Sequence, residues 1–550
     1  MIEILESRIA PAAVFFYTDV DGDHVKVSVT GTKGTNAELA TAVEAGLTNF
    51  GSGQKAVGNP HQLGLLTLGS DFAGGSLSIT STPSTDLDPV GTTTLMGNGF
   101  VNVGEINATG IDMASVSIHG DLGQIIVGSG VGKTPGLGSL NVDSMGDFGT
   151  STGSNSMLSR FINGVTSITV AHDVNGVLLR AERANSTSTV PTAKIGSIFI
   201  GGNLIGGSAT DTGEIAAADG IGSVKIMGSV IGGSAADTGR IDTNAGGNIG
   251  SIMIGGDLVG GSATATGVIF SPADIGSVTI KGSVLGGSAI TTGGIDGENI
   301  GSVAIGGDLM GTAFSSTSNV DHAGFVRVQD NIKTVLVGGS LIPGSETGGG
   351  TLSFSASIQA GQTLGAMTVL GSIQGTATQT VVISGAGLKA PTKRTQDPAI
   401  LSVSVGGSSN YAVIEGGYDL NGNPVSGDAQ IGAVKIGGDM IASDIIAGVK
   451  VKTAGTDFGT STDTTIDVPT TPPVLTDGIL SMIKSIVVGG QIEGTVATGD
   501  SFGIEAQLIG PITTGGVKLQ IEKTGTPLLD DEYISQTTGH DVHIREFPGM

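Results

Sequence analysis

Short apolar runs separated by glycine-rich turns recur along the chain at a nearly constant interval. The clearest copies share the pattern Ile-Gly-Ser, an apolar residue, any residue, and an apolar residue, and they begin at Ile195, Ile221, Ile249, Ile275 and Ile300. Successive starts are therefore 26, 28, 26 and 25 residues apart. Looser copies extend the series from Leu63 to Ile483, which gives fifteen copies in all. A fixed period of this length indicates a repeat architecture.

Each copy contains three apolar stretches of strand length, bounded by Gly-Gly, Gly-Ser or Thr-Gly. In the first stretch, Val224 and Ile226 share one face while Lys225 points away, as the two-residue period of a strand requires. The boundary glycines supply the positive φ angles of tight corners. We therefore predict an all-β parallel β-helix (β-solenoid) of about fifteen coils of ~26 residues. A β-propeller is the alternative, but its blades need ~40 residues.

Stacked coils place equivalent residues on top of one another. Val224 should lie between Ile198 and Ile252, and no coil can bury its apolar face alone, so stability should come from neighbouring coils. Hydroxyl side chains should form two further ladders, one of Ser208, Ser234, Ser262 and Ser288 and one of Thr212, Thr238, Thr266 and Thr292.

The two ends depart from the repeat. Apolar stretches at 13–18 and 24–30 flank an Asp-rich turn and predict a hairpin, and Thr35 with Glu38 forms a capping-box pattern. Leu39, Val43 and Leu47 then predict a helix over 36–48 that covers the first coil. We divide the chain into an N-terminal cap (1–62), a solenoid (63–502) that is most regular at 195–310 and has a polar insertion near 452–478, and a C-terminal cap with an irregular extended tail (503–550).

Composition narrows the functional classes. Glycine accounts for 96 of 550 residues, cysteine and tryptophan are absent, and aromatic residues make up 3%. Disulfide scaffolds and cysteine-ligated metal sites are excluded. A net charge of −25 argues against nucleic-acid binding. No run of 18 apolar residues exists, so no transmembrane segment is expected, and the N-terminus lacks the pattern of a standard secretory signal.

One turn suggests a metal site. Asp19, Asp21 and Asp23 surround Gly22, and alternate carboxylates of this kind can converge on a hard cation such as Ca²⁺. An EF-hand loop would also need a glutamate where Thr30 stands. The alternative is an Asp-Gly hairpin turn without an ion.

Other motifs favour structural interpretations. Residues 125–134 resemble a phosphate-binding loop, but Val127 stands where a glycine is needed and Pro135 follows where a helix should begin. Gly-Gly-Asp turns at Asp257, Asp308 and Asp439 differ from calcium-binding rolls, whose period is nine residues. His540 and His543 are expected to be exposed tail residues rather than a metal pair.

The N-terminus carries a resemblance. Residues 5–12, Leu-Glu-Ser-Arg-Ile-Ala-Pro-Ala, followed by Tyr-Thr-Asp-Val-Asp-Gly-Asp at 17–23, resemble the opening of a family of bacterial exported or surface proteins with β-strand repeats. This resemblance implies an exported β-solenoid and implies no activity.

Two functional hypotheses follow. The first is a non-enzymatic, extracellular structural or adhesive protein of the bacterial cell surface, without catalytic residues or a cofactor other than the Ca²⁺ considered above. It would assemble head to tail into a homo-oligomeric filament or coat through residues 1–18 and 527–550. The alternative is a β-helix that binds or degrades a surface polysaccharide as a lyase or hydrolase. Its candidate residues lie in irregular turns: Asp143, Asp147, His172 and Asp173.

Overall fold

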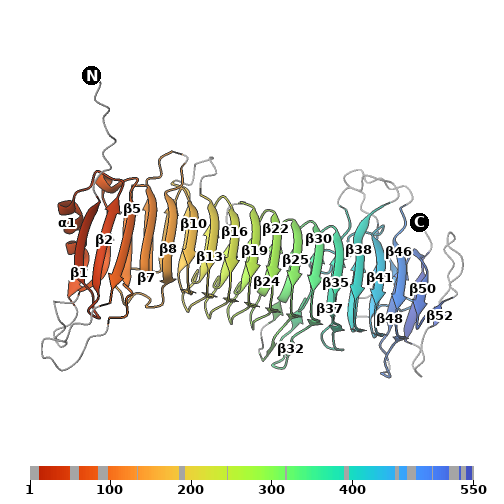
Figure 1. Ribbon diagram of the computed structural model, residues 1–550. Helices are drawn as coiled ribbons and strands as arrows, with labels where there is room; N and C mark the ends of the chain where they lie inside the picture. Colours follow the sequence, from red (N-terminus) through yellow and green to blue (C-terminus); the bar gives the residue numbers. More distant parts are fainter. Residues whose placement is uncertain are drawn as a thin grey trace, which may run out of the picture. The chain divides into compact units, whose positions relative to one another are not determined.

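The computed structural model describes residues 12–49, 61–83, 97–132, 134–184, 193–243, 246–315, 317, 319–388, 396–451, 457–467, 479–497, 499–519, 532–533 and 541–547. The chain separates into two compact units, residues 1–255 and 256–550, and each is described by itself. Strands dominate both units and pair mostly in parallel (Figure 1). The predicted parallel β-solenoid is confirmed.

One coil of the first unit shows how the repeat folds. β13 (Ile195–Ile200), β14 (Leu204–Ile205) and β15 (Glu214–Ala217) form three faces of one coil. They pair in parallel with β16 (Ile221–Ile226), β17 (Val230–Ile231) and β18 (Arg240–Asp242) of the next coil. Each apolar stretch of the sequence has become one strand.

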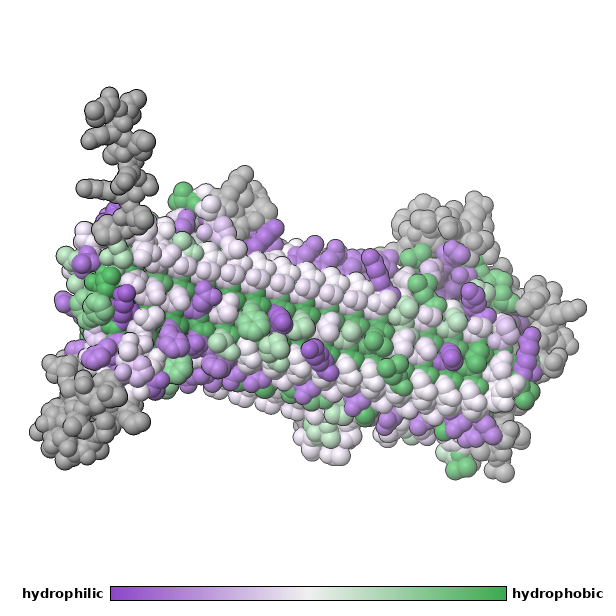
Figure 2. Space-filling model, in the orientation of Figure 1, coloured by the Kyte–Doolittle hydropathy of each residue, from purple (hydrophilic) through white to green (hydrophobic). Residues whose placement is uncertain are grey.

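Like residues stack inside the coils. Val224 is paired with Ile198 on one side and with Ile252 on the other, and each is 2% exposed. In Figure 2, residues of similar hydropathy form lines across successive coils within each unit. The aliphatic stacks and the parallel ladders therefore replace the large aromatic residues and disulfides that the sequence lacks.

The remaining strands of the first unit complete its faces. They are β1 (Ala13–Thr18), β2 (His24–Thr30), β3 (Leu47–Asn49), β4 (His61–Thr67), β5 (Ser76–Thr82), β6 (Val103–Thr109), β7 (Met113–Gly128), β8 (Leu137–Met145), β9 (Leu158–Ile162), β10 (Val165–Val170), β11 (Val174–Asn175), β12 (Leu178–Glu182) and β19 (Ile249–Ile254), with a 3-10 turn at Ser70–Phe72.

The second unit, by itself, also stacks its strands on three faces. The first face holds β22 (Ile275–Ile280), β25 (Ile300–Ile305), β30 (Ile332–Val337), β35 (Leu364–Val369), β38 (Pro398–Val405), β41 (Gln430–Ile436), β46 (Met482–Val488) and β50 (Ile512–Thr514). The second holds β20 (Leu258–Val259), β23 (Val284–Leu285), β26 (Leu309–Met310), β31 (Leu341–Ile342), β36 (Ile373–Gln374), β39 (Ser409–Asn410), β42 (Met440–Ile441) and β47 (Ile492–Glu493). The third holds β21 (Val268–Ser271), β24 (Thr292–Gly297), β29 (Ala323–Val328), β34 (Ile358–Ala360), β37 (Val381–Gly385), β40 (Ala412–Gly416), β43 (Asp444–Ala447), β48 (Phe502–Ala506) and β53 (Val542–Glu546).

Glycine alternates with larger residues at the second position of the first-face strands in part of the second unit. There Lys333, Gly365, Leu401, Gly432 and Lys484 follow one another on successive coils. A Cβ on Gly365 would lie 2.0 Å from the Lys333 carbonyl oxygen, and one on Gly432 would lie 1.9 Å from that of Leu401. At these two positions the carbonyl of the preceding coil leaves no room for a Cβ, which accounts for part of the glycine excess.

A hydrogen-bond ladder runs along one corner of the coils. Asp257 Oδ1 accepts from Ser283 N (2.7 Å), Ser283 Oγ accepts from Asp308 N (3.0 Å), and Asp308 Oδ1 accepts from Ser340 N (2.7 Å). The alternation of Gly-Gly-Asp with Gly-Ser in the repeats thus supplies one side-chain acceptor to each coil.

The N-terminal cap has the predicted hairpin and helix. β1 pairs antiparallel with β2, and α1 (Asn36–Gly46) begins with the expected capping box between Thr35 and Glu38. The helix ends before Leu47, which the prediction included, because Leu47 starts β3 and pairs with Leu63 of β4. Helix α1 lies beside β1 and packs against β4 (Figure 1).

The described parts of the tail fold back onto their own chain. β53 pairs in parallel with β48, and β52 (Glu532–Tyr533) pairs antiparallel with β53.

Short strand pairs lie outside the three faces. At the polar insertion, β44 (Val449–Lys450) and β45 (Thr464–Thr465) pair antiparallel, whereas 452–456 and 468–478 lie outside the described residues. Three further short strand pairs project from the coils or close their end: β27 (Ala313–Phe314) with β32 (Ser345–Glu346), β28 (Val320–Asp321) with β33 (Leu352–Ser353), and β51 (Val517–Lys518) with β50. β49 (Leu508–Ile509) pairs in parallel with the start of β46.

None of the described helices has the length and apolar character needed to cross a bilayer.

Candidate metal centre

The turn between β1 and β2 brings the three predicted carboxylates together. One ligand oxygen from each of Asp19, Asp21 and Asp23 lies within 4.8 Å of the others, and no other group of three potential ligands among the described residues does so. Two oxygens on opposite sides of a Ca²⁺ ion, each 2.3–2.6 Å from it, would be about this far apart. The spacing therefore fits one calcium ion.

Backbone hydrogen bonds fix the turn. Asp19 Oδ1 accepts from Asp21 N (3.3 Å) and Asp23 N (2.9 Å), while Asp23 Oδ2 accepts from Gly99 N (2.6 Å). Gly22 has a φ of 98°, which favours glycine. The chain thus holds the carboxylates in place by its own hydrogen bonds.

The carboxylates are crowded and largely buried. Asp19 is 5% exposed and Asp23 is fully buried, and the Oδ1 atom of Asp21 is buried without a hydrogen-bond partner. Burial, together with a hydrogen bond to the neighbouring Asp21 carboxyl and the charge of that carboxyl, raises the pKa of Asp19 to about 8. A bound cation would offset this repulsion and offer Asp21 Oδ1 a partner. Geometry and donor set therefore fit Ca²⁺.

A second turn of the same form occurs in the other unit. Asp419 Oδ1 accepts from Asn421 N (2.9 Å) and Asn423 N (2.8 Å), and Gly422 has a φ of 75°. Here the two later positions are amides, and Asn423 Nδ2 donates to Asp419 Oδ2 (3.1 Å). The turn therefore forms with one carboxylate, and the two additional carboxylates of the first turn are not needed to fold it.

Two of the polysaccharide candidates have side-chain partners. Asp143 Oδ2 lies 2.8 Å from His119 Nδ1, and Asp173 Oδ1 accepts from Asn203 N (2.6 Å) as part of a corner ladder. For Asp147 and His172 the bonded group is the backbone N–H: Asp147 N donates to Asp121 Oδ1 (3.2 Å), and His172 N donates to the Asp143 carbonyl (2.7 Å).

The remaining motifs are placed as follows. Residues 125–128 belong to β7, and the corner after them leads into β8 at Leu137 rather than into a helix. Lys133 and His540 lie outside the described residues, and His543 lies in β53. The carboxylates of Asp257, Asp308 and Asp439 accept from backbone N–H groups of the next coil.

Sequence reasoning missed a buried acidic cluster in the second unit. Glu415, Asp444 and Glu505 lie on β40, β43 and β48 and are 6%, 8% and 0% exposed. Burial raises the pKa of Glu415 and Asp444 to about 8 and that of Glu505 to about 9. A single acid inside an apolar strand, as in Val-Ile-Glu-Gly or Gly-Ile-Glu-Ala, was the available signal.

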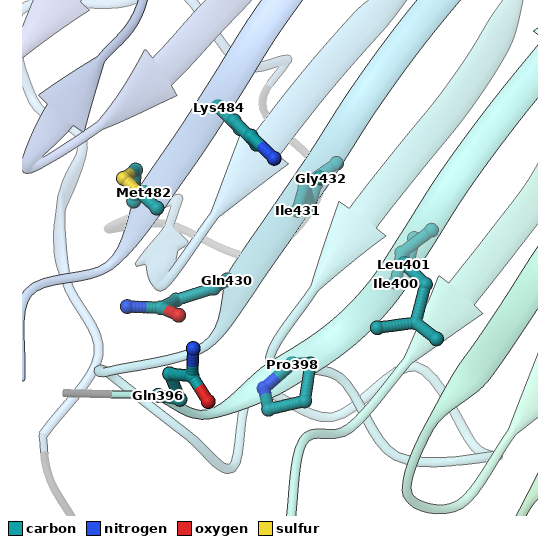
Figure 3. A pocket seen from close by; sticks show the side chains of 9 residues that line it. All are labelled: Gln396, Pro398, Ile400, Leu401, Gln430, Ile431, Gly432, Met482 and Lys484. Atoms are coloured by element: carbon teal, nitrogen blue, oxygen red, sulfur yellow. The ribbon is translucent and has the colours of Figure 1, made fainter. Parts of the chain in front are cut away.

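A shallow groove of about 530 Å³ lies over β38, β41 and β46. Figure 3 shows the side chains of Leu401 and Lys484 on either side of Gly432, with Gln396 and Gln430 close to each other. The groove thus arises where glycine stands between two larger residues on successive coils. The described residues of its lining include one cation and two amides, and no carboxylate.

The comparisons add no assignment. Residues 5–11, which carry most of the family resemblance, lie outside the described residues. No protein-family model, no curated protein and no solved structure matches this chain, so any functional assignment depends on the residues and geometry described above.

Proposed function

We propose that the protein is a non-enzymatic structural β-solenoid of the bacterial cell surface that assembles head to tail through residues 1–18 and 527–550. The observation that carries this proposal is the pairing between coils. Among the described strands, the inner coils of each unit are hydrogen-bonded to the coil before and the coil after, so unpaired strand edges are expected at the ends of the stack. Edges of this kind are templates for pairing with another chain.

The terminal strands support this mechanism. β1 pairs with β2, and Phe16 on β1 is 66% exposed. At the other end, β53 pairs in parallel with β48, and β49, β50, β51 and β52 lie between these two strands in the chain order. The same parallel pairing could form with the β48 of a second copy, which is strand exchange. The contact would be heterologous and would produce a filament where it does not close.

A Ca²⁺ ion bound in the Asp19 turn would stabilise this assembly. The turn joins β1 to β2, so a bound Ca²⁺ would hold the terminal hairpin in the conformation that a second copy would meet. The surface location and the export of the protein are proposals that depend on the resemblance at residues 5–12 and 17–23.

Assembly is tested by light scattering after size exclusion and by negative-stain microscopy over a range of concentrations, with and without Ca²⁺. We expect filaments or concentration-dependent oligomers from the wild-type chain, and their loss in Phe16→Asp. Phe148→Asp is the matched control, because Phe148 is also an exposed phenylalanine (51%) of the first unit but lies outside the terminal strands. Monomers under every condition, or equal loss in both variants, would contradict the proposal.

A further inference from the structure

A pocket of about 280 Å³ in the second unit opens beside β40, β43 and β48. Its walls combine three carboxylates with three aromatic side chains, namely Asp444, Asp457, Asp500, Tyr411, Phe458 and Phe502. The rings of Tyr411 and Phe502 are 6.2 Å apart and almost perpendicular. The hydroxyl groups of Thr380 and Ser501 complete the polar lining. The pocket is therefore acidic, aromatic and small.

The acidic cluster lies behind this pocket. Asp444 belongs to both, and its Oδ1 accepts from Gly503 N (2.7 Å). The charges of Asp444 and Asp463 both act on Glu505, whose side chain is fully buried and shares a hydrogen bond with the Asp463 carboxyl. Burying carboxyl groups side by side is costly unless a proton or a positive charge compensates them.

Few protein cations act on this cluster. On the third face of the first unit, arginines pair with the acids: Arg160 with Glu182, Arg183 with Asp219, and Arg240 with Asp242 (3.1 Å). On the third face of the second unit, Arg327 pairs with Asp296. Among the described residues, Arg545 is the one basic residue whose charge acts on Glu415, Asp444 or Glu505. It also donates to the Thr460 carbonyl. Acids therefore outnumber cations around this cluster.

The three pocket carboxylates do not surround one Ca²⁺ ion. Among the described residues only the Asp19 turn has three ligand atoms within 4.8 Å of one another, the spacing that fits one Ca²⁺. An ammonium group needs fewer carboxylate partners, to which it donates at about 2.7–2.9 Å. Aromatic rings attract the same group.

We propose that this pocket binds the ammonium group of an amino sugar. The hydroxyl groups of Thr380 and Ser501 and the aromatic side chains suit the rest of a sugar ring, and the volume suits a ligand of about one ring. Asp444 and Asp457 would accept hydrogen bonds from the ammonium group. This proposal does not depend on filament formation, and it identifies a glycan that an acidic surface protein would recognise.

Isothermal titration calorimetry of the full chain tests the proposal, with glucosamine as the probe and N-acetylglucosamine, which has no positive charge, as the ligand control. We expect saturable glucosamine binding and at least tenfold weaker binding of N-acetylglucosamine. Asp457→Asn should weaken glucosamine binding about tenfold. Asp457 is exposed, so the variant should fold. Asp467→Asn is the matched control. Asp467 is also an exposed carboxylate near the polar insertion, but it pairs with Lys450 (3.3 Å) and does not line the pocket.

Four outcomes would overturn the proposal. Absence of saturable binding would exclude the site, and equal binding of both sugars would indicate a neutral-sugar pocket. Equal losses in Asp457→Asn and Asp467→Asn would indicate general charge attraction. Tighter binding of Nα-acetyl-lysine methylamide than of glucosamine would indicate a lysine side chain of a protein partner. Filament formation is measured separately, so failure of either proposal is distinguishable from failure of the other.

Discussion

The turns at 19–23 and 419–423 share one backbone design and differ in charge. In each, an aspartate carboxylate accepts from the N–H groups of the second and fourth residues after it. The third residue after it is a glycine with positive φ. The first turn has carboxylates where the second has Asn421 and Asn423, and it is more deeply buried. The second turn shows what the backbone needs, so the additional charge of the first indicates a further role.

Calcium should separate the two turns most strongly. With Ca²⁺ at about 100 times its dissociation constant, we expect hydrogen exchange in residues 13–30 to slow by up to about 100-fold, equivalent to about 2.7 kcal/mol. Exchange around Asp419 should not change. The variant with both Asp21→Asn and Asp23→Asn, which copies the amides of the second turn, should lose the response. Slowing that persists in this variant would show that Ca²⁺ acts elsewhere.

The pH dependence of the first hairpin should be the next largest effect. The pKa of Asp19 is raised to about 8 in the folded protein, so between about pH 4 and 8 the folded state holds more protons than the unfolded state. Without Ca²⁺, stability should therefore fall as pH rises through this window, by at most about 1.4 kcal/mol between pH 6 and 7.

The measurement for Asp19 is hydrogen exchange of residues 13–30, corrected for the intrinsic pH dependence of exchange. Asp19→Asn keeps an oxygen that can accept from Asp21 N and Asp23 N, and it should remove this contribution. A slope that is unchanged in the variant would assign the pH dependence to other groups.

Replacing the positive-φ glycine should destabilise the two turns by the same amount. Gly22→Ala and Gly422→Ala each place a side chain at positive φ and should each cost about 1 kcal/mol. Local exchange around each turn measures the two costs. A loss at one turn only would show that the two backbones are not equivalent.

Introducing the two additional carboxylates into the turn at 419–423 should have the smallest effect on stability. The variant with Asn421→Asp and Asn423→Asp gains the three carboxylates but remains more exposed. At a Ca²⁺ concentration equal to the dissociation constant, the gain in stability would be about 0.4 kcal/mol. Titration calorimetry should detect one additional weak site. Absence of that site would show that burial, as well as charge, is required for binding.

Local sequence patterns predicted the elements well because each depends on near neighbours along the chain. The two-residue alternation around Val224 set the strand faces, and Thr35 with Glu38 set the start of α1. The end of α1 was predicted too late, because Leu47 pairs with Leu63, a contact between segments distant in the sequence. The Asp19 turn was identified as a candidate site because its three carboxylates are also close in sequence.

The sequence by itself determined the repeat period, the β-strands of each coil and the candidate calcium site, because each of these depends on residues that are close together in the sequence. Only the tertiary structure brought Asp444, Asp457 and Asp500 to one pocket, because their distance in space depends on which coils stack. The partners of each acid also depend on the stacking. Arg183 forms an ion pair with Asp219, whereas both the acid Asp463 and the cation Arg545 act on Glu505.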